Sequence, residues 1–276
     1  MPTITLTRKE SQTNPKIPIE AEIISPDVFL NKSKEQIAEL IIWRGNRQLP
    51  LNDLFTLDLD NDLNCKIDDL KIILEGDLAN IKRIGQGITG GEILINSSIG
   101  MHVGFQMKGG KITVNGDADD FAGANMEGGE IIINGNAGHY LGGSIRGDWR
   151  GMSGGKIRVE GNVGNETGVW MRNGIIEIGG NAPMFLGMHM HRGLIIIDGN
   201  VEERAGAEMT GGVIIIKGIL HKLLPSFEFK KKTNSIKLEE YGEIKGNYLE
   251  LAGDFAERKQ GLLYLDESKN SFHFKD

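Results

Sequence analysis

The feature that most constrains this chain is a unit of thirteen residues that occurs seven times along it. Most copies carry methionine at the fourth position, paired glycines at the sixth and seventh, and a closing stretch such as KITVNG (111–116). Successive copies begin 19 residues apart, except that 26 residues separate the starts of the third and fourth. The copies occupy residues 85–97, 104–116, 123–135, 149–161, 168–180, 187–199 and 206–218. This period predicts a solenoid with one coil per repeat.

Each copy ends in alternating apolar and polar residues, the pattern of a strand with one buried face. In the second copy, Ile112 and Val114 share that face. A strand this short cannot bury its apolar side alone, but coils stacked about 4.8 Å apart can bury it between them. Methionines form a second apolar column, and we expect them to pack inside the coils rather than bind a soft metal, because a flexible thioether fills gaps well. They are Met107, Met126, Met152, Met171, Met190 and Met209, with Ile88 in the first copy.

Glycines and asparagines mark the corners of the expected coils. The glycine pair before each strand stands where the backbone turns sharply or takes a positive φ angle. After the strands comes a column whose side chains are expected to stack as a ladder: Asp77, Asp117, Asn136, Asn162, Asn181 and Asn200. One strongly apolar strand and one weaker, methionine-bearing strand per coil favour an all-β fold. We predict a right-handed parallel β-helix of about 7–8 coils with a 19-residue period.

The regions on either side of the repeats differ from them in sequence, and we expect them to cap the open ends of the solenoid. Within the N-terminal region, residues 33–43 are predicted to form a short helix, with Ser33 as its N-cap and Gln36 as the capping-box partner. The C-terminal region is expected to add a hairpin or two strands at the other end. The three expected segments are an α+β cap over residues 1–70, the β-helix over 71–218 and a β extension over 219–276.

Composition excludes several classes of function. The net charge of −7 argues against nucleic-acid binding, which usually needs a basic surface. Cys65 is the single cysteine, so this chain alone forms no internal disulfide, zinc ribbon or four-thiolate iron–sulfur site. No apolar run approaches the ~20 residues of a membrane span, and the first residues lack a signal-peptide core. We therefore expect a cytoplasmic protein without membrane insertion.

The 26-residue interval adds seven residues to one coil. Trp149 stands at the unit position where the other copies have glycine, so we expect an outward loop just before it, beside Trp170 and Arg172. Tryptophan and arginine are enriched where one protein surface covers another. The alternative is a loop that folds down on its own coils, with Arg–Asp pairing at its tip. The residues expected at a partner interface are Arg146, Asp148, Trp149, Arg150, Trp170, Arg172, His189 and His191.

No complete catalytic or metal site emerges from the sequence. His189 and His191 flank the inward Met190 and should point outward together, but no nearby carboxylate or cysteine completes a metal site. Glu127 lies two coils from Trp170, so the paired acid and base of a glycoside-cleaving enzyme is not evident. We expect no catalytic, cofactor-binding or metal-binding residue in this chain.

These residues resemble a known family. The pattern [GW]-x-x-M-x-x-G-x-[IL]-x-[IV]-x-G is similar to the repeat of the C subunit of formylmethanofuran dehydrogenase, and the resemblance covers essentially the whole chain. It includes IPIEAEIISPDVF (17–29), GDWRGMSGG (147–155) and GNYLELAGDFAERKQGLLYL (246–265). A looser likeness is to the C-terminal β-helix domain of glutamate synthase. The departures from the pattern are Ile88, Ser97, Asn173 and Arg192.

The resemblance implies a non-catalytic scaffold subunit of an oxidoreductase complex. That complex would reduce CO2 with ferredoxin electrons and form N-formylmethanofuran in the first step of methanogenesis. The implied partners are a CO2-reducing subunit with a tungsten or molybdenum pterin, an amidohydrolase-like subunit with a dinuclear metal centre, and ferredoxin-like subunits with iron–sulfur clusters. This chain itself would hold no cofactor. Two alternatives are the C subunit of a bacterial formyltransferase/hydrolase complex and an autonomous β-helix enzyme acting on carbohydrate.

Overall fold

Strands dominate the structure, a computed structural model, and its α-helices have only four or five residues each. The all-β class predicted from the sequence agrees with this content. The structure describes residues 2–9, 17–61, 63–238, 241–258 and 260–274. Among these residues, no helix has both the length and the apolar character needed to cross a membrane.

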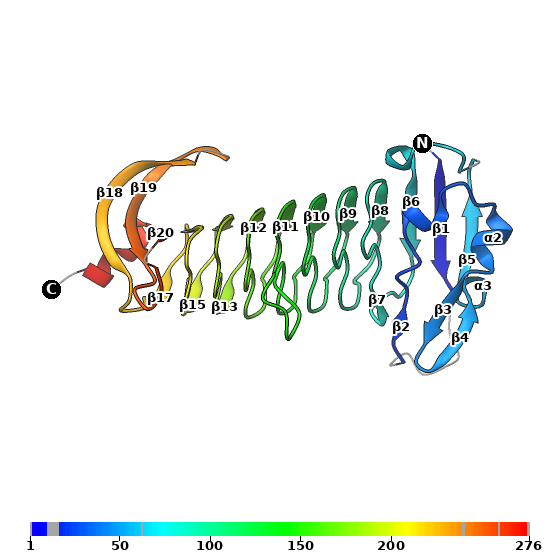
Figure 1. The fold of residues 1–276 in the computed structure, drawn as a ribbon, viewed down its shortest axis with the longest axis horizontal. Coiled ribbons are helices and arrows are strands. Elements are labelled where there is room, and N and C mark those ends of the chain that lie inside the picture. The colour runs from blue at the N-terminus through cyan, green and yellow to red at the C-terminus, as the bar shows by residue number, and fades with distance from the viewer. Residues whose placement is uncertain (1, 10–16, 62, 239–240, 259, 275–276) are drawn as a thin grey trace.

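Each repeat contributes one strand to a large sheet, in which neighbouring repeat strands pair in parallel without a register shift. Ile112 lies opposite Ile131, which in turn lies opposite Ile157. The repeat strands are β8 (Glu92–Ile95), β9 (Lys111–Val114), β10 (Glu130–Ile133), β11 (Lys156–Val159), β12 (Ile175–Ile178), β14 (Leu194–Ile197) and β16 (Val213–Ile216), and β6 (Lys71–Glu75) precedes them in the same sheet. Figure 1 shows the corresponding turns of the chain stacked in a row along the long axis.

A second line of parallel pairing runs along the coils. It begins as single bridges, from Leu78 to Ile99 and on through Ala118 to Ala137. Toward the C-terminal end it widens into a three-stranded sheet of β13 (Ala182–Met184), β15 (Val201–Glu203) and β17 (Leu220–Lys222). Each coil is therefore bonded to its neighbours on two sides, which holds the coils in register.

Apolar side chains fill the inside of the coils. The paired aliphatic residues of the repeat strands are buried, as predicted, and so is the whole methionine column with Ile88. The prediction of a methionine-bearing strand was wrong, because the segment before the methionine is a tight turn in every methionine-bearing copy except the fourth. Met107 N–H donates to the carbonyl of Gly104 at 3.1 Å, and Gln106 between them has a φ of +55°. The turn aims the methionine inward without extended backbone.

The Asp/Asn column forms the predicted ladder. From Asp117 onward, the side-chain Oδ1 of each member accepts a hydrogen bond from the backbone N–H of the residue that follows it one coil later, for example at 2.8 Å from Asn181 N to Asn162 Oδ1. Asp77 departs from the prediction, because its Oδ1 accepts from Ala79 N–H at 3.3 Å and the Ser98 hydroxyl oxygen accepts from Asp117 N–H instead. The same bond joins Asp117 to Asn136, Asn136 to Asn162, Asn181 to Asn200 and Asn200 to Ile219. These bonds satisfy corner N–H groups that the strands leave unpaired.

The N-terminal region covers the first coil. Its strand β1 (Thr3–Arg8) pairs in parallel with β6, and β5 (Phe55–Leu59) pairs antiparallel with β1. The capping box of Ser33 and Gln36 is present, but α2 (Lys34–Ala38) is shorter than predicted, because Ile41 already begins β3. The other elements are β2 (Ile19–Glu20), α1 (Pro26–Phe29), β3 (Ile41–Arg44), β4 (Arg47–Pro50), α3 (Leu51–Leu54), the 3-10 helix Ile67–Asp69 and β7 (Ile81–Lys82).

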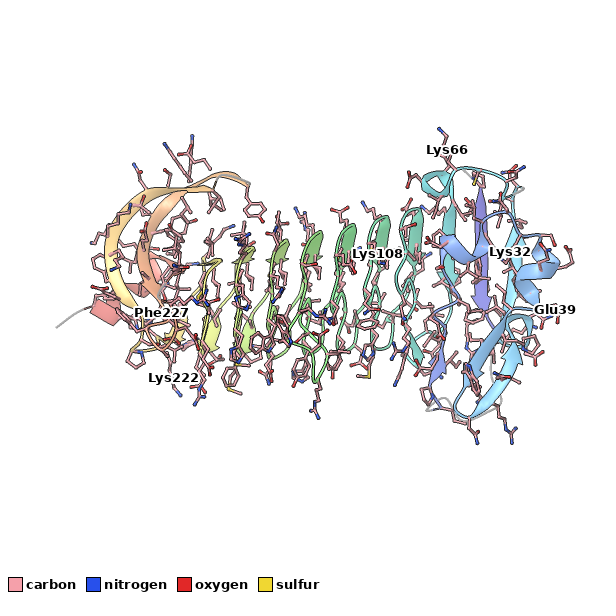
Figure 2. All side chains as sticks on the ribbon, viewed as in Figure 1. Lys32, Glu39, Lys66, Lys108, Lys222 and Phe227 are labelled. Carbon is pink, nitrogen blue, oxygen red and sulfur yellow. The ribbon has the colours of Figure 1, made fainter. Side chains whose placement is uncertain are left out.

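The C-terminal region adds three strands to the same sheet. They are β18 (Glu228–Leu238), β19 (Gly242–Gly253) and β20 (Gly261–Asp266), followed by α4 (Glu267–Asn270) and the 3-10 helix Ser271–Phe274. The β18–β19 hairpin arches over the outer face of the sheet (Figure 1), where Ile236 and Tyr248 pack with Leu194 and Ile215 in a second small core. Phe227, at the C-terminal end of the row in Figure 2, is buried beneath it.

Candidate partner interface

The extra seven residues leave the fourth coil at a place other than the predicted one. Gly142, with a φ of +61°, occupies the glycine slot, because a Cβ there would lie 2.7 Å from Ile176 Cδ1, just as one at Gly123 would crowd Ile157. Met152 N–H donates to the Gly142 carbonyl at 2.9 Å, the bond that Met126 makes to Gly123. The prediction that Trp149 fills the slot was wrong. The insertion is residues 144–150, and it leaves the coil between the glycine and the methionine.

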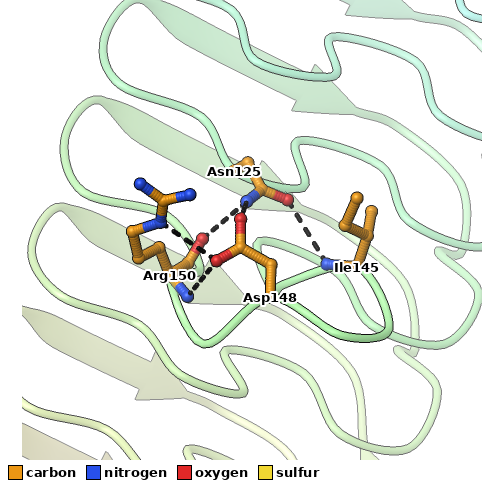
Figure 3. A network of polar contacts seen from close by, with 4 residues as sticks. All are labelled: Asn125, Ile145, Asp148 and Arg150. Atoms are coloured by element: carbon orange, nitrogen blue, oxygen red, sulfur yellow. Dashed lines mark hydrogen bonds and ion pairs between the residues drawn. The ribbon is translucent and has the colours of Figure 1, made fainter.

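The inserted loop is fastened to the preceding coil by Asn125 (Figure 3). The Asn125 amide donates to Asp148 Oδ2 at 3.1 Å and to the carbonyl of Arg150 at 2.6 Å, and its oxygen accepts from Ile145 N–H at 3.3 Å. Asp148 Oδ1 in turn accepts from Arg150 N–H at 3.1 Å and from Arg150 Nε at 3.0 Å. The Arg–Asp pairing foreseen as an alternative is therefore present, and it gives the loop one defined shape.

The loop presents Trp149 to solvent, with 56% of the residue exposed. The Arg172 guanidinium carbon lies 4.5 Å from the centre of the Trp149 ring system, and that of Arg150 lies 5.9 Å from it. Beside the loop is an open hollow of about 330 Å³, lined by Gln106, Asn125, Glu127, Asp148, Arg150, Gly151, Ser153 and Arg172. Arg146 is exposed on the loop.

Trp170, His189 and His191 form a neighbouring group on the next two coils. The Trp170 and His189 rings stack with centroids 4.0 Å apart, and His191 lies 6.2 Å from Trp170. His189 Nδ1 is 3.6 Å from Glu208 Oε2, and the Thr210 hydroxyl is hydrogen-bonded to His191 Nδ1 at 2.6 Å. Burial lowers the pKa of His191, and the Arg172 cation lowers it further.

A column of residues with left-handed backbone conformation was missed in the sequence. Its members stand two residues before the first glycine of each coil and have φ between 60° and 66°: Arg83, His102, Phe121, Tyr140, Glu166, Phe185 and Arg204. Phe121 lies between His102 and Tyr140, with parallel rings at 5.0 and 4.6 Å. The signal was available, because aromatic residues recur there at the same 19-residue spacing.

The described residues do not fit a metal or acid–base site. Within them, no group of three or more His, Cys, Asp or Glu side chains is placed to hold a metal ion. The structure does bring a second carboxylate, Asp148, into the hollow with Glu127, which the sequence did not indicate. The hydrogen bond from Arg150 lowers the pKa of Asp148, so this group is held ionised rather than protonated as an acid catalyst. No reaction step follows from this pair.

Known proteins match this chain in sequence. The model of the GXGXG motif family matches residues 96–245. The C subunit of tungsten-containing formylmethanofuran dehydrogenase 2 from Methanococcus maripaludis is 49% identical over 262 residues, which cover 92% of this chain and 94% of that relative. This chain belongs to the family of formylmethanofuran dehydrogenase C subunits.

Other relatives in the family match over shorter stretches. The tungsten-containing C subunit from Methanothermobacter thermautotrophicus is 46% identical over 104 residues, so the match spans 38% of this chain and 37% of that relative's length. A C subunit of molybdenum-containing formylmethanofuran dehydrogenase 1 from Methanosarcina barkeri is 40% identical over 87 residues. Members of this family are thus named as parts of both tungsten- and molybdenum-containing enzymes.

Among solved structures, this family member resembles a chain of the formyltransferase/hydrolase complex (FhcABCD) from Methylorubrum extorquens, crystallised with methylofuran. The TM-score is 0.80 at 26% identity, and the match covers 95% of this chain and 99% of that one. That neighbour is a component of a multi-subunit assembly, which supports a hetero-oligomeric setting for this family.

Proposed function

We propose that this chain is a non-catalytic scaffold subunit of a formylmethanofuran dehydrogenase complex, which reduces CO2 with ferredoxin electrons and forms N-formylmethanofuran. The observation that carries the proposal is the anchored loop. It holds an exposed tryptophan between two arginines on an otherwise regular solenoid. A large aromatic side chain kept in water costs free energy unless a partner covers it, and Trp and Arg dominate the energetics of interfaces.

In this proposal the coils form a right-handed parallel β-helix over residues 71–218, between a cap at 1–70 and an extension at 219–276. Such a solenoid offers long, stiff faces on which other subunits can be held at fixed distances. The pterin and its tungsten or molybdenum, the iron–sulfur clusters and the dinuclear metal centre belong to those other subunits, which are a CO2-reducing subunit, an amidohydrolase-like subunit and ferredoxin-like subunits. The complex would lie in the cytoplasm.

The C subunit of a formyltransferase/hydrolase complex is the second candidate, because the Methylorubrum extorquens chain matches nearly the whole fold. Sequence identity is 49% to the Methanococcus maripaludis relative and 26% to the Methylorubrum extorquens chain, which favours the dehydrogenase complex. Neighbouring genes for a pterin enzyme and a polyferredoxin would support the dehydrogenase, whereas a neighbouring formyltransferase gene would support the alternative. An autonomous carbohydrate-active enzyme would require the purified chain to turn over a polysaccharide.

The scaffold role can be tested by purifying the native complex through this chain and measuring its mass and subunit content. Replacing Trp149, Arg150 and Trp170 together by Ala should release at least one subunit during size-exclusion chromatography, while the variant chain stays folded by circular dichroism. A triple Ala variant at Arg158 in β11, Glu160 just after β11 and Glu177 in β12 is the control, and it should keep all subunits.

An intact and fully active complex with the Trp149, Arg150 and Trp170 variant would show that this face holds no partner. A native chain that purifies alone, with no other subunit under any salt condition, would contradict the scaffold role as a whole.

A further inference from the structure

Arg172 differs from several other basic residues of the coils, which are paired with carboxylates. Lys111 is paired with Glu130 at 3.2 Å, and Lys156 with Glu177 at 2.9 Å. The guanidinium of Arg172 makes no hydrogen bond or ion pair with any residue that the structure describes, and its Nε is buried without an acceptor. A buried N–H donor without an acceptor costs free energy. Arg172 as a whole is only half-buried, so the rest of its guanidinium is open to an incoming acceptor.

Arg172 is nevertheless held in place. Its guanidinium lies on the face of Trp149, 4.5 Å from the ring centre, and its backbone N–H donates to the Met152 carbonyl at 2.7 Å. The contact with the ring and the backbone hydrogen bond restrict where the guanidinium can lie before anything binds. A planar fork of donors suits a carboxylate, which accepts two parallel N–H bonds.

The charges around Arg172 also favour an anionic group. Asp148 is already neutralised by Arg150 at 3.0 Å. Glu127 occupies the position of Arg172 two coils earlier, so it lies about 10 Å away, where salt screens much of its repulsion. Arg146 adds a further exposed positive charge on the loop. The surface is thus locally cationic on a chain whose net charge is −7.

We propose that Arg172 and Trp149 form the binding site for an acidic segment of a partner subunit. An Asp or Glu carboxylate of that segment accepts hydrogen bonds from the Arg172 guanidinium, and its neighbouring residues cover the exposed Trp149 ring. This inference rests on the proposed scaffold function and adds the chemistry by which one partner is recognised.

The test compares native complexes that carry Arg172→Gln or Arg172→Lys in this chain. Each complex is immobilised through this chain, and the dissociation rate of each partner is followed at about 50 and about 300 mM NaCl, a range over which screening changes strongly. Arg172→Gln should speed the release of one partner about tenfold or more at the lower salt concentration, and it should remove most of the salt dependence of the wild-type rate. Arg172→Lys keeps the charge but not the planar fork, so its dissociation rate should lie between those of wild type and Arg172→Gln.

Two matched variants are the controls. Glu127→Gln removes a charge from the far end of the same hollow and should change the rate less than about threefold, toward slower release. Arg158→Gln removes an arginine of the preceding coil that is paired with Glu160, and its rate should equal that of wild type.

The carboxylate contact would be overturned if Arg172→Gln released its partners at the wild-type rate. It would also be overturned if the variant released them faster by the same factor at both salt concentrations. Either result leaves the scaffold role standing, because the wild-type complex would still be assembled. Loss of every partner from the wild-type chain would instead contradict the scaffold role.

Discussion

At the residue scale, this molecule is shaped by left-handed backbone conformations at its corners. Besides glycine, thirteen of the described residues have a positive φ, most of them in two columns spaced by the repeat. Such a conformation costs a non-glycine residue about 1 kcal/mol or more. The stacked rings of His102, Phe121 and Tyr140 contribute contacts that offset this cost in one column. The glycines between the two columns are more restrictive, because at most of them a Cβ would meet an isoleucine of the core.

The glycine slot of the fourth coil gives a sharp prediction. Gly142→Ala should lower the free energy of unfolding by about 2 kcal/mol, because it adds left-handed strain and a Cβ 2.7 Å from Ile176 Cδ1. Trp149→Ala should change it by less than about 0.5 kcal/mol, as for an exposed side chain. Gly147→Ala, at φ +87° with no atom within 4 Å, should show the backbone cost alone. Urea unfolding measures all three. If Trp149→Ala lowered the free energy of unfolding more than Gly142→Ala did, Trp149 rather than Gly142 would occupy the glycine slot, as the sequence predicted.

His102 predicts a pH dependence of stability. Its pKa is lowered from 6.5, first by burial and then by the Arg83 cation. The unfolded chain therefore binds a proton more readily than the folded one, and stability should fall as the pH drops below about 6.5 toward the lowered value. His102→Phe should reduce the difference in Tm between about pH 7.5 and about pH 5.5, which bracket the ordinary histidine pKa. Phe121 already shows that phenylalanine fits this column. An unchanged difference would mean that other groups carry the acid sensitivity.

Sequence reasoning succeeded where the determinant is local and repeated. Alternation and spacing alone predict which residues of each strand are buried. They also predict the inward methionines and the Asp/Asn ladder. The point at which the seven extra residues leave the coil cannot be predicted in this way. It depends on whether Met152 N–H bonds to the residue three positions before it or to the more distant Gly142. The stack of Arg172 on Trp149 is likewise a contact between coils, which no local pattern specifies.

At the element scale, the inserted loop is a structure in its own right, built on one side chain of the coil beneath it. Asn125 is suited to this task because it tolerates φ +54° and can donate and accept at once. The helix predicted at 33–43 shows the opposite outcome. There the local cap was correct, but pairing of Ile41–Arg44 with two strands ended the helix early.

Asn125→Gly should therefore loosen the loop without disturbing the coil. Glycine accepts the positive φ, but the hydrogen bonds to Asp148, Arg150 and Ile145 are lost, at about 1 kcal/mol each at most. Amide exchange over residues 144–150 should become about tenfold faster, with a much smaller change over the β strands. Gln106→Gly makes the same change one coil earlier, where the structure shows no bond to the loop, and should leave the exchange of 144–150 unchanged. Equal exchange in both variants would show that the loop holds its own shape.

At the scale of the whole molecule, the coils interact with their immediate neighbours, so stability should depend on coil number and register rather than on any single coil. Figure 1 shows this plan, with the row of turns closed by β1 and β5 at one end and by the C-terminal strands at the other. Both ends of the large sheet are therefore covered by added strands, and the coils between them are interchangeable in principle.

Removal of one whole coil tests this plan. Deletion of residues 104–122 joins Val103 to Gly123 in register and brings His102 into the place of Phe121 beside Tyr140. We expect the variant to fold cooperatively with a lower Tm, and to be shorter by about 4.8 Å in small-angle scattering. Deletion of residues 104–113, which puts strand residues into a turn position, should abolish cooperative unfolding by circular dichroism. If both deletions unfold alike, the coils are not independent units, and stability resides in the caps and their contacts with the first and last coils.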